Sequence, residues 1–271
     1  MPGGFQVPDQ DGAGTVEAVG EGVDPGRVGQ RVWLWFAARE RPWGTAAEYT
    51  VVPARQAVPL PDGASFDLGA SIGIPAMTAW HCLFADGPVD GPVLVSGGAG
   101  AVGNAAIRLA KAAGLTVVST VSSDEKAAAA RDAGADAVVD YRAGSVDDTA
   151  RAVRAAAPDG VSRVVEVAPA SNAELNLQVG APHLVVAAYA DDGEPVPVPG
   201  RRSMLGNVAW KFVLVYTIGD RALDAAVAGV SEAVAAGTLV VPPLHRFSLD
   251  DVAAAHDAVQ QGAVGKVVID V

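Results

Sequence analysis

The stretch VLVSGGAGAVGNAAIRLAKAAG, residues 93–114, runs from apolar residues into glycines and then resumes with a helical pattern. Gly98, Gly100 and Gly103 have the spacing of a Gly-x-Gly-x-x-Gly motif. The motif follows a predicted strand, opens a predicted helix and leads into a second strand, TVVSTV (116–121). In this setting such glycines hold the diphosphate of a dinucleotide, so the stretch predicts a nucleotide-binding βαβ unit.

Each glycine of the motif has its own expected role. Gly98 permits a tight turn, Gly100 lets the backbone approach a pyrophosphate, and Gly103 lets the helix lie close to the strand. The free N–H groups and the dipole at the start of the helix attract the phosphates. The alternative is that the glycines only tighten the turn between strand and helix.

Short valine-rich strands alternate with helical segments from residue 93 to about residue 190. This alternation predicts a doubly wound α/β domain, in which helices cover both faces of a parallel sheet. The apolar stretch AWKFVLVYTI (209–218) is expected to extend the sheet, and a long helix is expected over 221–236.

The flanking segments have a different pattern. Residues 31–60 contain the strand-like pieces RVWLW, AAEYTVV and QAVPL, which predict a small β domain, and residues 66–85 are expected to be helical around Pro75. Near the end of the chain, Ser248 fits the start of a helix and Gly262 its end, before a last strand, GKVVIDV.

These patterns predict two domains, with the second inserted into the first. The β domain is expected to consist of residues 1–76 and 238–271, and the nucleotide-binding domain of residues 77–237.

The composition excludes several classes of function. The 19 Lys and Arg residues against 31 Asp and Glu residues give a net charge of −12, which would repel nucleic acid. Cys82 is the only cysteine and the four histidines form no i,i+4 pair, so no metal site is predicted. With neither a signal peptide nor a long apolar run, the sequence predicts a cytoplasmic protein that does not enter a membrane.

The end of the second strand indicates which dinucleotide is bound. A site for NAD usually has a carboxylate there, whereas this chain has Ser122 and Ser123 followed by Lys126. Hydroxyls and a cation suit the 2′-phosphate of NADPH, and Tyr141 and Arg142 are possible further contacts. The alternative for Lys126 is a solvated helix residue.

Two other classes with a glycine-rich first loop fit the sequence less well. No tyrosine has a lysine four residues later, as a short-chain dehydrogenase requires. A methyltransferase that uses S-adenosylmethionine normally has an acid at the end of the second strand, where this chain has serines.

The order of motifs along the chain resembles the medium-chain dehydrogenase/reductase superfamily, specifically its zinc-independent, zeta-crystallin-like quinone oxidoreductase branch. The resemblance rests on these stretches: GAGTVEAVGEGV (12–23), VGQRV (28–32), GTAAEYTVVPA (44–54), GASIGIPAMTAWHCLF (69–84), residues 93–114, STVSSDEKAAAARDAGADAVVDYR (119–142) and AAAHDAVQQGAVGKVVIDV (253–271). It implies a GroES-like catalytic domain with an inserted Rossmann domain. Zinc-dependent relatives have Gly-His-Glu where this chain has Asp9-Gln10-Asp11.

The resemblance also implies a set of cofactor-binding residues. Pro75 and Thr78 would lie near the nicotinamide. The residues expected at the pyrophosphate are Ala99, Gly100, Ala101 and Val102, with Gly98 and Gly103 shaping the turn. Ser122, Lys126 and Tyr141 would hold the adenosine phosphate. The ends of later strands would line the crevice with Val167, Ala168, Ala188 and Tyr189, for which sheet-edge packing is the alternative.

The implied reaction is hydride transfer from NADPH to a quinone or an α,β-unsaturated carbonyl compound. No catalytic residue is identified; Tyr49, Tyr189, Tyr216 and His81 are candidates for a proton donor. The group Trp33, Phe36 and Trp43 would form either an aromatic acceptor pocket or part of the core.

The family usually has some 50–60 further residues before the stretch equivalent to 12–23. We therefore keep a second expectation open, an NADPH-binding protein without turnover. Family members are commonly dimers joined through edge strands, and the apolar stretch FVLVYTI (212–218) is the expected edge, with packing inside the sheet as the alternative.

Overall fold

The computed structural model describes residues 4–191 and 193–271. The chain divides into two compact units, one of residues Thr78–Ala226 and the other of Met1–Met77 together with Val227–Val271. The long helices α1 (Phe66–Phe84) and α7 (Asp220–Ala235) each contain a point of division. No helix within the described residues is both long and apolar enough to cross a membrane.

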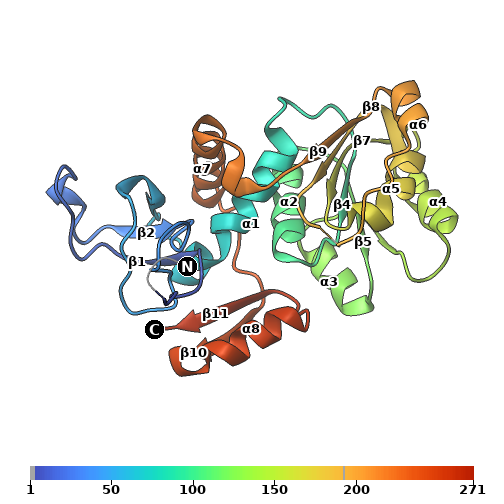
Figure 1. The fold of residues 1–271 in the computed structure, drawn as a ribbon. Helices are drawn as coiled ribbons and strands as arrows, with labels where there is room; N and C mark the ends of the chain where they lie inside the picture. The colour runs from blue at the N-terminus through green and yellow to red at the C-terminus, as the bar shows by residue number, and fades with distance from the viewer. Residues whose placement is uncertain (1–3, 192) are drawn as a thin grey trace. The chain divides into compact units, whose positions relative to one another are not determined.

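The unit of residues 78–226 is built on a six-stranded parallel sheet with the order β6-β5-β4-β7-β8-β9 (Figure 1). Its strands are β4 (Val93–Ser96), β5 (Val117–Val121), β6 (Ala137–Asp140), β7 (Val161–Glu166), β8 (Gly180–Ala188) and β9 (Ala209–Phe212). The chain adds β5 and β6 on one side of β4 and then returns to place β7 on the other side. The strand order therefore reverses between β4 and β7, the point at which open α/β sheets bind ligands.

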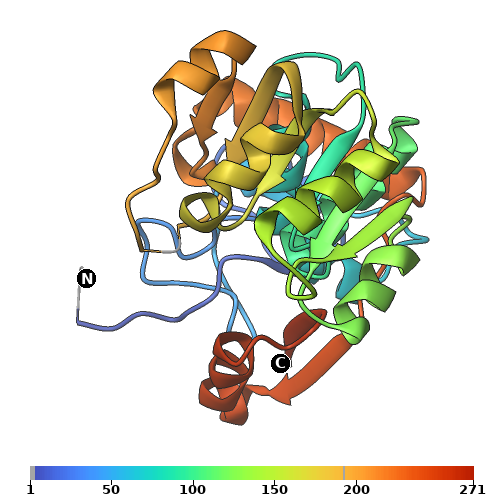
Figure 2. The ribbon, with the colours of Figure 1, turned by 90° about the vertical axis from the view of Figure 1, so that its right-hand side faces the viewer.

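Helices cover both faces of this sheet. They are α2 (Ala101–Ala112), α3 (Asp124–Asp132), α4 (Val146–Ala156), α5 (Pro169–Val179) and α6 (Gly200–Gly206). α4 and α5, yellow-green and yellow in Figure 2, lie over the face turned to the viewer, and their apolar residues pack on those of β4, β7 and β8. The expected doubly wound Rossmann fold is confirmed.

One expected extension of the sheet is shorter than predicted. β9 pairs with β8 over Ala209–Phe212, and the chain then turns into a 3-10 helix, Val215–Thr217. The apolar stretch 209–218 is therefore only partly a strand. β9 is the last strand of the sheet, and Phe212 and Leu214 are exposed.

The other unit contains two small sheets. β1 (Gly12–Thr15), β2 (Arg31–Leu34) and β3 (Ala57–Pro59) form an antiparallel sheet in that order. β10 (Leu244–Ser248) and β11 (Lys266–Asp270) pair in parallel and are joined through α8 (Val252–Gln260). A 3-10 turn, Leu249–Asp251, separates Ser248 from α8, so the helix begins later than the sequence predicts.

The expected strand AAEYTVV (46–52) is not a strand in the structure. Its first residue, Ala46, donates its N–H to Pro8 O at 3.2 Å, and no other strand pairs with the segment in the described part of the chain. Residues 47–52 and β1 instead border a cavity of about 590 Å³. Alternation of apolar and polar residues favours an extended backbone, but a strand also needs a neighbour, which the local pattern does not reveal.

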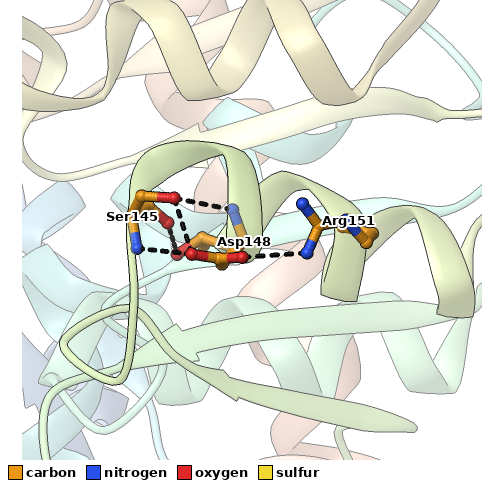
Figure 3. Close-up of polar contacts among 4 residues, drawn as sticks. Ser145, Asp148 and Arg151 are labelled. Carbon is orange, nitrogen blue, oxygen red and sulfur yellow. Dashed lines mark hydrogen bonds and ion pairs between the residues drawn. The ribbon is translucent and has the colours of Figure 1, made fainter.

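The start of α4 is closed by its own side chains (Figure 3). The Ser145 hydroxyl accepts the Asp148 N–H at 3.2 Å, and the Asp148 carboxylate accepts the Ser145 N–H at 3.0 Å, which is a capping box. Arg151 donates to the same carboxylate at 2.8 Å. The hydrogen bonds from Ser145, together with Arg151, lower the pKa of Asp148 to about 2.

Candidate functional site

The glycine-rich turn joins β4 to α2 at the carboxyl edge of the parallel sheet. Gly97 adopts a left-handed conformation, with φ of 71°, and its N–H donates to Thr120 O on the neighbouring strand at 3.0 Å. Gly100 then donates its N–H to Gly97 O at 3.0 Å and closes the turn. The left-handed residue of the turn is therefore Gly97, the residue before the Gly98 to which the sequence assigned the tight turn.

Gly98 and Gly103 are required for close packing. A Cβ on Gly98 would lie 2.1 Å from Ser119 Oγ and 2.7 Å from Ile107 Cδ1. A Cβ on Gly103 would lie 2.3 Å from Gly97 O, so α2 approaches the turn as closely as backbone atoms allow. The expected role of Gly103 in helix–strand packing agrees with this geometry.

The start of α2 has no side-chain cap in the described part of the chain. Its N-cap residue is Gly100, and the first backbone hydrogen bond of the helix runs from Asn104 N–H to Gly100 O at 2.8 Å. The N–H groups of Ala101 and Val102 therefore precede the hydrogen-bond ladder of the helix. Helix starts of this kind attract phosphate, because the N–H groups and the dipole both favour an anion.

Polar residues gather at the end of β5. Lys126 Nζ donates to Ser122 Oγ at 3.1 Å, and Arg142 Nη1 donates to Ser122 O at 3.2 Å. Ser123 caps α3 by accepting the Lys126 N–H at 3.3 Å. Tyr141, which precedes Arg142 in the sequence, is half exposed and donates its N–H to Val121 O at 3.1 Å. The structure thus brings together the hydroxyl and the cations that the sequence proposed for a phosphate.

The residues expected in the crevice lie at the ends of β7 and β8. Val167 follows β7, and its Cγ1 would lie 3.2 Å from a Cβ on Gly97. Ala168 is the N-cap of α5, and Ala188 is buried at the end of β8. Tyr189 donates its N–H to Glu166 O at 3.0 Å.

Tyr189 is partly buried, and Thr78 is almost completely buried. Burial, together with the nearby Cys82 and Glu166, raises the pKa of Tyr189, so its phenol stays protonated at neutral pH. Thr78 is buried on α1, within the unit of residues 78–226, whereas Pro75 of the same helix belongs to the other unit.

The other candidate residues differ in their exposure to solvent. Trp33 and Phe36 are completely buried, so the proposed aromatic acceptor pocket is wrong and these two residues form core. Trp43 is half exposed and packs edge-on against Phe5, with ring centroids 5.1 Å apart. Tyr49 is exposed, and burial lowers the pKa of His81.

One buried polar residue of this edge was not predicted from the sequence. Glu166, the last residue of β7, is completely buried and accepts a hydrogen bond from Ser96, the last residue of β4, at 3.0 Å. A single acid inside the apolar run RVVEVA (163–168) was the available signal.

Family models match both parts of the chain. Residues 101–232 match the model described as zinc-binding dehydrogenase, and residues 1–62 match the alcohol dehydrogenase GroES-like domain. A mycobacterial protein whose structure was solved as a complex with NADPH superposes with a TM-score of 0.83 at 30% identity, over 96% of this chain and 81% of that one. A structure of a mycobacterial quinone oxidoreductase superposes with a TM-score of 0.82 at 30% identity, over 96% of this chain and 81% of that one. This chain belongs to the medium-chain dehydrogenase/reductase superfamily, in its quinone oxidoreductase branch.

Two curated members of the branch differ in how far they align. The pig quinone oxidoreductase is 28% identical over 97% of this chain and 79% of its own length. The rat quinone oxidoreductase is 31% identical over 64% of this chain, and the match spans about half of the rat protein, 51%.

The name of the first family model raises the question of zinc. No group of three or more His, Cys, Asp or Glu side chains able to hold a metal occurs within residues 4–191 and 193–271. Burial raises the pKa of Cys82 to about 12, so it remains a thiol rather than the thiolate that zinc prefers. The Asp11 carboxylate already accepts the Ile74 N–H at 2.8 Å and lies 3.7 Å from Lys266 Nζ. These residues do not fit a zinc site.

Proposed function

We propose that this protein is a zinc-independent, NADPH-dependent oxidoreductase that reduces a quinone or an α,β-unsaturated carbonyl compound. The observation that carries the proposal is the uncapped start of α2 beside the cluster of Ser122, Lys126 and Arg142 at one edge of one sheet. The helix start suits a diphosphate, and the cluster suits a 2′-phosphate.

The proposal assigns a part of the cofactor to each group of residues. Ala99, Gly100, Ala101 and Val102 face the pyrophosphate, while Gly98 and Gly103 keep the turn and α2 close together. Ser122, Lys126 and Tyr141 hold the adenosine phosphate, with Arg142 as a further cation. Val167, Ala168, Ala188 and Tyr189 border the crevice, and Pro75 and Thr78 approach the nicotinamide.

The domain roles follow from the same assignment. We propose that residues 77–237 bind the cofactor and that residues 1–76 and 238–271 form the GroES-like catalytic domain.

The cofactor and the protein have different roles in the proposed reaction. Bound NADPH supplies the hydride. The chain positions the reactants and provides a hydrogen-bond donor for the oxygen of the acceptor, on which negative charge develops. Tyr189 is the proposed donor, because it follows the end of β8 and a phenol hydroxyl is protonated at neutral pH.

We also propose that the protein is a homodimer joined through β9. This strand has β8 on one side and ends the sheet on the other. Phe212 is 62% exposed and Leu214 is 57% exposed, so pairing with a second copy would cover apolar surface and an open strand edge. Sedimentation velocity on the wild type and on Phe212→Lys tests this, and a monomeric wild type contradicts it.

A binding experiment and an activity assay test the function. Calorimetric titration of the wild type with NADPH and NADH should give tighter binding of NADPH. Absorbance of the reduced nicotinamide should then fall in the presence of 1,4-benzoquinone or a simple enone. Binding without oxidation of NADPH by any acceptor of the panel would instead support an NADPH-binding protein without turnover, and no binding of either coenzyme would contradict both.

A further inference from the structure

Ser96 and Glu166 meet at the reversal of the strand order. Ser96 ends β4 and Glu166 ends β7, and the two strands run in parallel register with Val95 opposite Val165. After these residues the two strands lead into different helices, β4 into α2 and β7 into α5. The Ser96 hydroxyl donates to Glu166 Oε2 at 3.0 Å, the side-chain hydrogen bond that joins the two strand ends.

The Glu166 carboxylate is held only by neutral donors among the described residues. Oε2 accepts from Ser96 and from Asn176 Nδ2 at 2.8 Å, and Oε1 accepts from the Ala168 N–H at 2.7 Å and from Asn172 Nδ2 at 2.8 Å. All four donors reach one completely buried side chain. Four hydrogen bonds satisfy the carboxylate, whereas an unsatisfied buried acid would strongly destabilise the fold.

The residues next to this pair shape the glycine-rich turn. Gly97 follows Ser96 and takes the left-handed conformation of the turn, and Val167 follows Glu166 and lies against Gly97. Ser96 is therefore held from the β7 side one residue before the turn begins. A shift of Ser96 relative to β7 would move Gly97 and, through its hydrogen bond to Gly100, the start of α2.

We propose that Glu166 is a positioning residue that, through Ser96, fixes the glycine-rich turn in the conformation that receives the cofactor diphosphate. The proposal rests on the proposed function for the nature of the ligand. Its mechanical part, the effect on the turn, is independent of any ligand.

The first test uses Ser96→Ala, which removes the link between the strands and leaves three donors on Glu166. The matched control is Ser203→Ala, since Ser203 is also buried in the same unit and accepts from Trp210 Nε1 at 3.1 Å. Without any ligand, amide hydrogen exchange at residues 97–100 should become about fivefold faster in Ser96→Ala, the equivalent of about one net hydrogen bond, and should not change in Ser203→Ala.

The second test measures NADPH binding by calorimetry well below the unfolding temperature of each variant. Ser96→Ala should bind NADPH about fivefold more weakly than Ser203→Ala. Glu166→Gln should keep most of the affinity for NADPH. Asn176 Oδ1 has no partner among the described residues, so after a flip of the Asn176 side-chain amide it can accept a hydrogen bond from the new amide of this variant.

The outcomes separate this inference from the proposed function. If the wild type binds no NADPH but Ser96→Ala still accelerates exchange at residues 97–100, the proposed function fails and the role of the pair in shaping the turn stands. If Ser96→Ala and Ser203→Ala have the same exchange rates at the turn, or bind NADPH equally well, the positioning role of Glu166 is overturned.

Discussion

The starts of α2 and α4 occupy equivalent places, each after a strand of the same parallel sheet, but they are completed in opposite ways. α4 has a capping box in which Ser145 and Asp148 satisfy each other's N–H groups. α2 begins at Gly100, which has no side chain to cap the helix. The closed start needs nothing further, whereas the open start leaves N–H groups available to an anion.

The start of α3 lies between these two cases. Ser123 caps the helix through the Lys126 N–H, while the Lys126 ammonium group turns toward Ser122. This start satisfies its own backbone and still presents a positive charge. The three starts differ in one or two side chains: α2 has no side-chain cap, α3 has a capping serine and a nearby lysine, and α4 has a capping box.

Substitution of Gly103 should give the largest effect. In Gly103→Ala the new Cβ would lie 2.3 Å from Gly97 O, so α2 must move away from the turn. We expect a loss of stability of about 1–3 kcal/mol and NADPH binding weakened about tenfold or more. Thermal unfolding and calorimetric titration measure both.

The matched control for this variant is Gly200→Ala at the start of α6. No atom lies within 4 Å of a Cβ at Gly200, so this variant should keep both the stability and the affinity of the wild type. If the two variants behave alike, close packing at Gly103 does not define the open helix start.

Removal of the charge at the start of α3 should act on one coenzyme only. Lys126→Ala should weaken NADPH binding by about 1–3 kcal/mol, the range for a lost charge-assisted hydrogen bond, and leave NADH binding unchanged. Lys111→Ala is the control, because Lys111 pairs with Asp136 at 2.8 Å and lies in the last turn of α2. An equal loss for NADPH and NADH in Lys126→Ala would show that Lys126 does not bind the 2′-phosphate.

The closed helix start should affect stability and not the cofactor. Ser145→Ala removes the cap of α4 and should lower the free energy of unfolding by about 0.5–2 kcal/mol. Its NADPH affinity should equal that of the wild type. Weaker NADPH binding in this variant would mean that the capped start also contributes to the site.

The smallest expected effect is on the loss of folding stability at low pH. The pKa of Asp148 is lowered to about 2 from its ordinary value of 3.8, so the contribution of this group to stability is complete above pH 4 and disappears as the pH falls through about 2. NMR titration of the carboxyl carbon should give this pKa directly. Between pH 4 and pH 2, Asp148→Asn should lose less stability than the wild type, and parallel losses would refute the assignment.

The sequence predicted the elements that depend on local pattern. Every residue of the valine-rich strands β4 and β5 is buried, and a helical pattern follows each strand, which requires a parallel sheet with helices on its faces. The residue types at the end of β5 likewise predicted the cluster around Ser122, because the carboxyl ends of neighbouring parallel strands meet at one edge.

The remaining features depend on contacts that no local pattern contains. As glycines, Gly97 and Gly98 are equally able to adopt a positive φ, so the sequence does not distinguish them. In the structure Gly97 has the positive φ, and Gly98 is the residue that packs against Ser119 and Ile107. The segment 46–52 has the alternation of a strand but lacks a partner strand in the described structure. Glu166 was missed because Ser96, the donor that links it to the strand before the glycine-rich turn, lies 70 residues away in the sequence.

The most direct measurement is an NMR titration of the labelled protein with NADPH, observed at the backbone amides of two helix starts. The amides of Ala101 and Val102 should shift strongly and become protected from exchange as the diphosphate binds. The amides of Val146 and Asp147 at the capped start of α4 should not change. Saturable NADPH binding that leaves Ala101 and Val102 unperturbed would contradict the account.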